Sequence, residues 1–246
     1  MVGYGGTDLG KKRENNEDNF FVNNNPLGPL KNLYIIADGL GGHNAGEVAS
    51  SLSIQHFCDF VNNNNNLEFT QDYLADAIKY ANTLVYHHSL ENKESTGMGT
   101  TFTCCSFDEN NLYFAHAGDS RLYIMVEDNL IQLTTDNSVL NELLAQGHSL
   151  SEIQERKDLN SLTRALGTEA NLKTDKGFHP IKNIKKVLLC SDGLSDIVKD
   201  KIILEILQKN DGEESIQLLI DKANELGGYD NISVIVLEKG VKGNVS

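Results

Sequence analysis

TTFTCCSFDENNLYFAHAGDSRLYIMVEDNLIQL, residues 100–133, holds four short runs that are rich in β-branched and aromatic residues. Clusters of Asp, Asn and Gly, which favour turns, separate these runs. The spacing predicts an antiparallel meander with strands at 100–107, 112–117, 121–126 and 130–133. The middle of the chain is therefore expected to be β-sheet.

Helical periodicity and further buried strands flank this meander on both sides. The chain before it is expected to hold a buried strand and two helices, at 33–37, 44–61 and 71–90. The chain after it is expected to hold short helices in a polar stretch, then a strand, two helices and a last strand, at 137–167, 186–190, 200–209, 213–226 and 232–237. This order predicts an α+β layered sandwich, and the lack of a Pro- or Ser-rich linker predicts one domain.

The composition excludes several classes of protein. The 246 residues include 21 Lys and Arg against 35 Asp and Glu, a net charge of −14, which disfavours nucleic acid or an anionic membrane as a partner. No apolar stretch is long enough to span a bilayer, and residues 1–10 show no secretory signal. The cysteines form no CxxC pair and are expected to be reduced thiols of a cytoplasmic protein: Cys58, Cys104, Cys105 and Cys190.

Two glycine-rich stretches are similar to nucleotide-binding loops but do not complete them. Residues 5–11 have the Gly-x4-Gly-Lys spacing, yet Lys12 stands where a phosphate-binding loop needs Ser or Thr for magnesium. Residues 39–44 follow an expected strand, yet Asn44 stands at the third glycine of a dinucleotide fingerprint. Nucleotide binding is therefore disfavoured at both stretches.

Aspartates recur at the ends of the expected strands. Asp38 and Asp192 each end a strand before a glycine, Asp230 directly precedes another strand, and Asp119 lies in the turn between two more. Any one of them is ordinary, because turns favour Asp. Several carboxylates that converge would repel one another unless a cation neutralised them, and ligation by oxygen alone suits Mg²⁺ or Mn²⁺. The pattern predicts a candidate carboxylate metal site.

Six sequence blocks give this pattern a specific resemblance. They are RENNED at 13–18, IADGLGGH at 36–43, GMGTT at 97–101, GDSR at 118–121, CSDGL at 190–194 and GYDN at 228–231. In this order, over nearly the whole chain, they resemble the metal-dependent protein phosphatases (the PPM family, type 2C Ser/Thr phosphatases), in particular the bacterial branch. The resemblance implies a four-layer αββα sandwich, two packed antiparallel sheets flanked by helices, in one catalytic domain over residues 1–246.

The resemblance also implies the ligands of a two-metal centre. Asp38 would bridge two metal ions, and the Gly39 carbonyl would bind one of them. Asp192 and Asp230 would complete the protein ligands of the other ion.

Three more acidic residues match positions around that centre. Glu17 and Asp18 would act mostly through metal-bound waters. Asp119 matches a residue that helps to hold a third, weaker ion in bacterial members, although a turn aspartate that bonds its own backbone is the alternative. The implied cofactors are two or three Mn²⁺ or Mg²⁺.

The implied activity is hydrolysis of phosphoserine and phosphothreonine in proteins by attack of a metal-bridging hydroxide, so no enzyme nucleophile is needed. Arg13 would bind the substrate phosphate through its planar fork; the alternative is a solvated neighbour of Lys11 and Lys12. His43 is either a general acid for the leaving oxygen or an ordinary histidine at a helix start. The expected partners are phosphorylated protein substrates of a Ser/Thr kinase, and the expected state is a monomer.

Residues 137–161 match the flap of the family, a segment beside the active site. Many bacterial relatives have Asp-His-Ser at its start, where this chain has Asp136-Asn137-Ser138. They often have a His-Pro pair further on, where this chain aligns Arg156-Lys157. Two alternative functions are a phosphatase for one regulatory partner, such as an anti-sigma-factor antagonist, and a pseudo-enzyme that only binds phosphoproteins. The occupied carboxylate positions favour catalysis.

Overall fold

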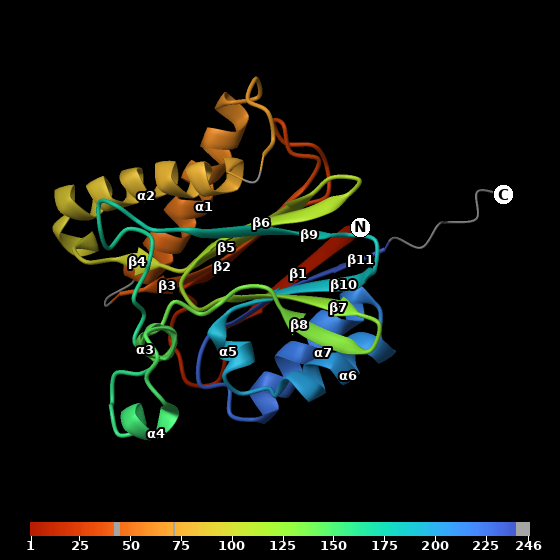
Figure 1. Ribbon diagram of the computed structural model, residues 1–246. Helices are drawn as coiled ribbons and strands as arrows, with labels where there is room; N and C mark the ends of the chain where they lie inside the picture. The colour runs from red at the N-terminus through yellow and green to blue at the C-terminus, as the bar shows by residue number, and fades with distance from the viewer. Residues whose placement is uncertain (42–44, 71, 240–246) are drawn as a thin grey trace.

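Two antiparallel sheets pack face to face in the computed structural model, which describes residues 1–41, 45–70 and 72–239 (Figure 1). The first sheet has the order β1 (Val2–Asp8), β11 (Ile232–Glu238), β10 (Ile184–Cys190), β7 (Arg121–Val126) and β8 (Asn129–Gln132). The second has the order β2 (Asp18–Asn23), β3 (Leu33–Leu40), β5 (Phe102–Phe107), β6 (Asn111–Ala117) and β9 (Asp175–Pro180). A two-residue strand, β4 (Gly99–Thr100), pairs with the end of β3.

Helices cover the outer face of each sheet (Figure 1). The second sheet carries α1 (Ala45–Asn63) and α2 (Tyr73–Glu91), and the first carries α6 (Asp200–Lys209) and α7 (Gly212–Glu225). The short helices are the 3₁₀ turn η1 (Lys93–Ser95), α3 (Val139–Ala145), α4 (Leu150–Ile153) and α5 (Asp192–Ser195). The α+β sandwich with two antiparallel sheets and flanking helices is confirmed.

The central strands are apolar throughout because both of their faces are buried. In β3, Ile35 and Ala37 pack with α1 and α2, whereas Tyr34 and Ile36 face the other sheet. Alternate side chains of a strand point to opposite faces, so one run of residues fills two layers of core. The buried runs that predicted β3, β10 and β11 have this origin.

The expected meander is wrong at one turn. β5 pairs with β6 in the second sheet, but β7 pairs with β8 in the first, so the chain crosses between sheets at residues 118–120. Gly118 has φ +117°, and a Cβ there would lie 2.6 Å from the Cβ of Thr101. The turn that was expected to close a hairpin is therefore a tight crossover that requires glycine at this position.

The strand β1 was missed because its glycines lack strand propensity. A Cβ on Gly5 would lie 2.6 Å from the Phe20 ring, so glycine lets β1 approach β2 closely. The stretch at 5–11 that is similar to a phosphate-binding loop is thus the end of a strand and the turn after it. Two more strands, β2 and β9, were also missed.

Residues 137–167 form the expected polar excursion with short helices, α3 and α4. Within this segment, α4 is the part that lies farthest from the two sheets (Figure 1). Over the described ranges, no helix is both long and apolar enough to cross a bilayer. All four cysteines are free; Cys104, Cys105 and Cys190 are buried and Cys58 is partly buried. The expectation of reduced thiols is met in this structure.

Candidate metal centre

Asp18 and Asp38 lie directly opposite each other on two neighbouring strands. The antiparallel register of β2 and β3 pairs these two residues. Cross-strand partners share one face of the sheet, with Cβ atoms about 4.5–5.5 Å apart, and like charges at such positions are destabilising. Sheet stability therefore does not explain why two aspartates face each other at this position.

The backbone of Asp38 is held by two threonines. Its N–H donates to Thr101 Oγ1 at 2.9 Å, and its carbonyl accepts the Thr101 N–H at 2.8 Å and the Thr100 hydroxyl at 2.9 Å. Thr101 Oγ1 also lies 2.7 Å from Ser120 Oγ, which stands next to Asp119. The threonines thus fix Asp38 and connect it to the crossover turn.

Asp18 is reached from the first sheet through a serine. Ser191 Oγ donates to Asp18 Oδ2 at 2.7 Å and accepts the Ser233 N–H at 2.9 Å. Asp18 Oδ1 is buried and has no hydrogen-bond partner. Sequence reasoning assigned Ser191 no role, and the structure gives it a positioning one.

Asp192 and Asp230 come from adjacent strands of the first sheet. Asp192 opens α5 directly after β10, and Asp230 stands just before β11, which pairs with β10. A Cβ on Gly193 would overlap the carbonyl oxygen of Asn231, so the two connections touch. Beside them lies a cleft of about 300 Å³, lined by Asp192, Gly193, Asp196, Ile197, Tyr229 and Asp230.

Asn231, which follows Asp230, holds the N-terminal loop beside the acidic residues through hydrogen bonds. Its Oδ1 accepts the Glu17 N–H at 2.9 Å, and its Nδ2 donates to the carbonyls of Leu9 at 2.9 Å and Asn15 at 3.0 Å. The loop that carries Arg13 and Glu17 is therefore anchored on the far end of the sequence. Sequence reasoning missed this residue, although it stands in the GYDN block.

Arg13 and Asp230 bond to each other. Arg13 Nη2 donates to Asp230 Oδ2 at 2.7 Å, and Asp230 Oδ1 accepts the Asn231 N–H at 2.8 Å. The Arg13 side chain is 48% exposed, and this hydrogen bond raises its pKa. The residue expected to bind phosphate and one of the expected metal ligands are thus neighbours.

Gly39 and Glu17 both lie against the first turn of α1. The Gly39 N–H donates to the Glu17 carbonyl at 3.1 Å. A Cβ on Gly46 would lie 2.9 Å from the Gly39 carbonyl oxygen and 2.8 Å from Glu17 Cδ. The absence of a side chain on Gly46 leaves room for both oxygen-bearing groups.

Burial and mutual repulsion raise the pKa of the clustered carboxyl groups. The pKa of Asp38 is raised well above its ordinary range, first by burial and then by Asp18, Asp192, Asp119 and Asp230. Burial also raises the pKa of Asp18 and Asp119 to about 6 and that of Asp192 to about 7. The structure brings the expected acidic residues together in one poorly solvated space.

The donor set fits a hard divalent cation. The buried oxygens Asp18 Oδ1 and Asp192 Oδ1 have no hydrogen-bond partner, and all the clustered groups offer oxygen. Within the described residues, no three His, Cys, Asp or Glu side chains already form a ligand set. Both carboxylate oxygens of Asp230 already accept a hydrogen bond, from Arg13 and from the Asn231 N–H. Release of Asp230 from Arg13 would free a ligand beside Asp192.

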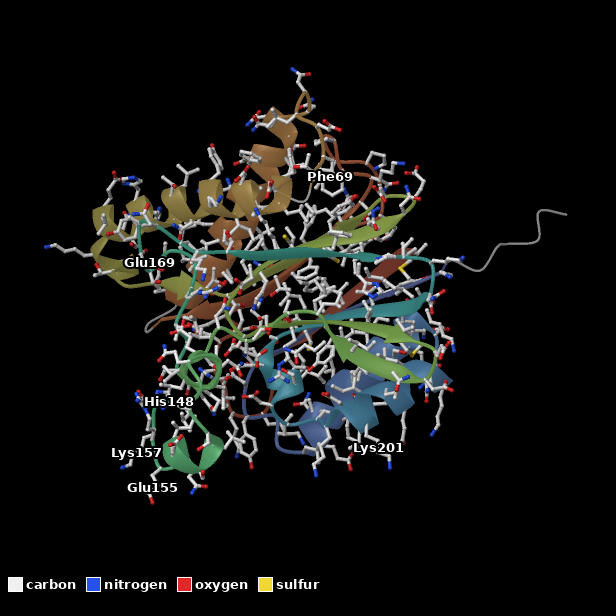
Figure 2. All side chains as sticks on the ribbon, viewed as in Figure 1. Phe69, His148, Glu155, Lys157, Glu169 and Lys201 are labelled. Atoms are coloured by element: carbon white, nitrogen blue, oxygen red, sulfur yellow. The ribbon has the colours of Figure 1, made fainter. Side chains whose placement is uncertain are left out.

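The histidines contribute little to the described site. His43 lies outside the described residues, so its two interpretations are unchanged. His116 is fully buried, bonds Thr103 Oγ1 at 2.8 Å, and has a pKa lowered by burial to about 4, which makes it a neutral structural residue. His148 lies on the flap with Glu155 and Lys157, exposed and far from the sheets (Figure 2).

We expect the carboxyl cluster to destabilise the metal-free protein increasingly as the pH rises from about 4 to about 7. The pKa values of Asp18, Asp119 and Asp192, at about 6 to 7, lie above the ordinary 3.8, so the unfolded chain loses these protons first. Their contribution to stability is full below pH 4 and is lost as the pH passes through 6 to 7. His116, with its lowered pKa, acts in the opposite sense.

Urea unfolding of the metal-free wild type and Asp192→Asn isolates the cluster, because His116 is common to both proteins. The variant should gain stability relative to wild type as the pH rises. A difference that is constant from pH 4.5 to 7.5 would contradict the expectation.

Known proteins resemble this chain over most of its length. The family described as Protein phosphatase 2C matches residues 2–176. "Serine/threonine phosphatase stp" of Listeria innocua is 35% identical over 240 residues, which cover 96% of this chain and 94% of the relative. "Serine/threonine protein phosphatase PstP" of Mycobacterium tuberculosis H37Rv is 34% identical over 235 residues, which cover 94% of this chain and 44% of the relative.

Solved structures resemble it equally well. The crystal structure of a bacterial serine phosphatase superposes with a TM-score of 0.88 at 32% identity and covers 98% of this chain and 99% of its own. The catalytic domain of PstP, in complex with two manganese ions, superposes with a TM-score of 0.80 at 32% identity and covers 96% of each chain.

Proposed function

Since the chain belongs to the protein phosphatase 2C family, the metal-dependent Ser/Thr protein phosphatases, we propose how its own residues carry out that reaction. The enzyme hydrolyses phosphoserine and phosphothreonine in proteins and requires Mn²⁺ or Mg²⁺. One observation supports the assignment of residues: acidic side chains from both sheets and the guanidinium of Arg13 meet at one end of the sandwich. The whole of residues 1–246 is assigned to one catalytic domain, with the flap at 137–161.

The assigned metal ligands are the carboxylates of Asp38, Asp192 and Asp230 and the carbonyl of Gly39. Glu17 and Asp18 are assigned to act through metal-bound waters, and Asp119 to hold a third ion. When bound, the ions lower the pKa of water and withdraw charge from the phosphate oxygens. The cross-strand position of Asp18 and its bond from Ser191 hold the carboxylates in place before any cation binds. The raised pKa values of Asp18, Asp38, Asp119 and Asp192 supply a reason for affinity, because a cation relieves the repulsion among these carboxylates.

Arg13 is assigned to the substrate phosphate. Its side chain is half exposed, and within the described part of the chain it donates a 2.7 Å hydrogen bond to Asp230, so the fork can turn outward. A planar guanidinium matches two phosphate oxygens at once. A divalent cation that took Asp230 as a ligand would release Arg13 for this contact.

Arg13→Ala should lower kcat/KM on a phosphothreonine peptide about 10- to 150-fold, the value of a charge-assisted contact worth about 1.5–3 kcal/mol. The loss should appear mainly in KM if the contact is already made in the bound substrate. Arg13→Lys keeps the charge but loses the fork, so it should recover only part of the loss. Steady-state kinetics at saturating Mn²⁺ measure both, with the exposed neighbour Lys12→Ala as a control that should behave like wild type. Unchanged kinetics of Arg13→Ala would place the phosphate contact elsewhere.

Asp119→Ala should leave two strongly bound ions and lower turnover. A third ion with fewer protein carboxylates would keep more of its waters and bind more weakly. Calorimetric titration with Mn²⁺, together with turnover at saturating Mn²⁺, measures the two effects separately.

Asp108→Ala is the matched control for Asp119→Ala. Asp108 is a turn aspartate whose Oδ1 accepts the N–H groups of Asn110 at 2.7 Å and Asn111 at 2.8 Å. Its loss should reduce stability by about 1 kcal/mol and leave metal binding and turnover unchanged. If Asp119→Ala behaved like this control, Asp119 would be structural.

The remaining assignments concern partners and location. The substrates are proteins phosphorylated by a Ser/Thr kinase, the enzyme is a monomer in the cytoplasm, and neither nucleic acid nor a membrane is a partner. The net charge of −14 and the free cysteines support these assignments. His43, outside the described residues, is assigned as the candidate acid for the leaving oxygen.

A further inference from the structure

We propose that Asp136 and Asn137, at the start of the flap, are positioning residues that hold the turn carrying Asp119. The inference rests on the role that the proposed function gives to Asp119. Its basis is a set of hydrogen bonds from Asn137 and Asp136 to the two ends of the turn, Gly118 and Arg121.

Asn137 grips the first residue of the turn. Its side-chain Oδ1 accepts the Gly118 N–H at 2.9 Å, and its own N–H donates to the Gly118 carbonyl at 2.6 Å. Asn137 is only 5% exposed. Gly118 has φ +117° and lies against Thr101, so the backbone at this point has little room to adjust.

Asp136 grips the last residue of the turn. Arg121 Nε donates to both Asp136 oxygens at 3.0 Å, and Arg121 Nη2 donates to Oδ2 at 2.7 Å. Gln132 Nε2 adds a hydrogen bond to Oδ1 at 2.8 Å. Two consecutive residues therefore hold Gly118 and Arg121, and Asp119 lies between the held ends.

The same asparagine also joins the two ends of the flap. The Asn137 carbonyl accepts the Thr163 N–H at 2.8 Å, where the chain returns from the flap. Asn137 Nδ2 donates to Asp175 Oδ2 at 2.8 Å, and Asp175 Oδ1 accepts Arg164 Nη1 at 2.9 Å. The two ends of the flap are thus connected through one residue, Asn137, to the backbone beside Asp119.

This arrangement connects the flap with the turn that carries Asp119. The outer part of the flap is exposed, and α4 lies far from the sheets (Figures 1 and 2). A shift of residue 137 changes its two hydrogen bonds to Gly118 directly, and a shift of residue 163 reaches Gly118 through Asn137. Asp136 and Asn137 therefore hold both ends of the turn and so set the direction of the Asp119 carboxylate; Asp136 also lines, with Asp119, Arg121 and Asp196, a cavity of about 500 Å³.

The test is a double-mutant cycle of Asn137→Ala and Asp119→Ala. Asn137→Ala should lose the weak ion in Mn²⁺ calorimetry, keep the two strong ions, and lower kcat by nearly as much as Asp119→Ala, with little change in KM. The double variant should be no slower than Asp119→Ala alone, since a positioning residue has no effect once the group that it positions is gone. Asp136→Asn keeps the side-chain volume and weakens the hydrogen bonds to Arg121. It should therefore weaken binding of the third ion and lower kcat, but by less than Asn137→Ala.

Asn32→Ala controls for the general loss of a buried asparagine. Asn32 is also 5% exposed, and its side chain makes two hydrogen bonds to the backbone of Phe107, at 2.9 and 3.0 Å. It precedes β3 and lies six residues, about 20 Å of extended strand, from Asp38. Asn32→Ala should lower stability and leave ion stoichiometry and kcat unchanged.

Three outcomes overturn the inference. Retention of the weak ion and of kcat by Asn137→Ala, while Asp119→Ala loses both, overturns the positioning role alone. Additive losses of kcat in the double variant also overturn it. If Asp119→Ala itself keeps the weak ion and normal kcat, the assigned role of Asp119 fails together with the inference, while the two-metal centre is untouched. If Asn137→Ala does not fold, Asp136→Asn decides by the same readouts.

Discussion

Asp38→Asn is expected to lower the turnover of a phosphothreonine peptide by about a thousandfold or more and to make the metal-free protein more stable. Bound ions would supply several kcal/mol of charge stabilisation, and each 1.36 kcal/mol is about tenfold in rate. In the proposed assignment Asp38 would be a ligand of both ions, so its loss would affect both. Without metal the same carboxyl is buried among four others. Its replacement by a neutral amide should raise the free energy of unfolding at neutral pH, because it removes both the burial of a charge and the repulsion among the carboxylates.

Kinetics at saturating Mn²⁺ and urea unfolding in EDTA measure these two effects. Asp211→Asn is the control, because Asp211 caps α7 by accepting the Glu214 N–H at 2.9 Å and lies outside the cluster. Asn is as good a cap as Asp, so this control should match wild type in both assays. An Asp38→Asn variant that is less stable than wild type without metal would contradict the electrostatic account of the cluster.

Chelation with EDTA should abolish hydrolysis, and Mn²⁺ or Mg²⁺ should restore it. Among the described residues, two side chains beside the cluster are poor substitute nucleophiles: Ser191 Oγ is bound to Asp18 and Ser233, and burial raises the pKa of the Cys190 thiol to about 12. The added ion should also raise the midpoint of thermal unfolding, because it binds the folded state. Assay and melting curve on the same metal-free and reloaded samples measure both. Full activity of protein shown to be metal-free would refute the mechanism.

Sequence reasoning succeeded for the strands and helices whose hydrophobic pattern lies within a single segment. The apolar runs of β3, β10 and β11 and the periodicity of the four long helices depend on neighbours along the chain, so they were predictable. By contrast, β1 contains three glycines, and β2 and β9 are edge strands of the second sheet that contain Asp, Asn or Gly. Pairing across the fold stabilises them, and no local pattern reports it.

The residues of the candidate site were likewise predictable only in part. Asp38, Asp119, Asp192 and Asp230 could be proposed from turn positions, and their placement in one cluster follows from the two sheets. The roles of Arg13 and Glu17 came from the resemblance. The residues that position the cluster were not predictable, because each acts through hydrogen bonds to distant segments, from 19 residues away for Asn137 to 222 for Asn231. They are Thr101, Asn137, Ser191 and Asn231.

The pairing of β1 with β11 makes the order of synthesis differ from the order of assembly. Val2 is paired with Glu238 and Asp8 with Ile232, so β1 leaves the ribosome long before its partner β11 (Figure 1). At about 5–20 residues per second, β1 waits roughly 10 to 50 s for that partner. The loop with Arg13 and Glu17 waits equally long for Asn231. A nascent chain therefore has no phosphatase activity until β11 emerges, and until then the edge of β1 is a surface for chaperones to protect.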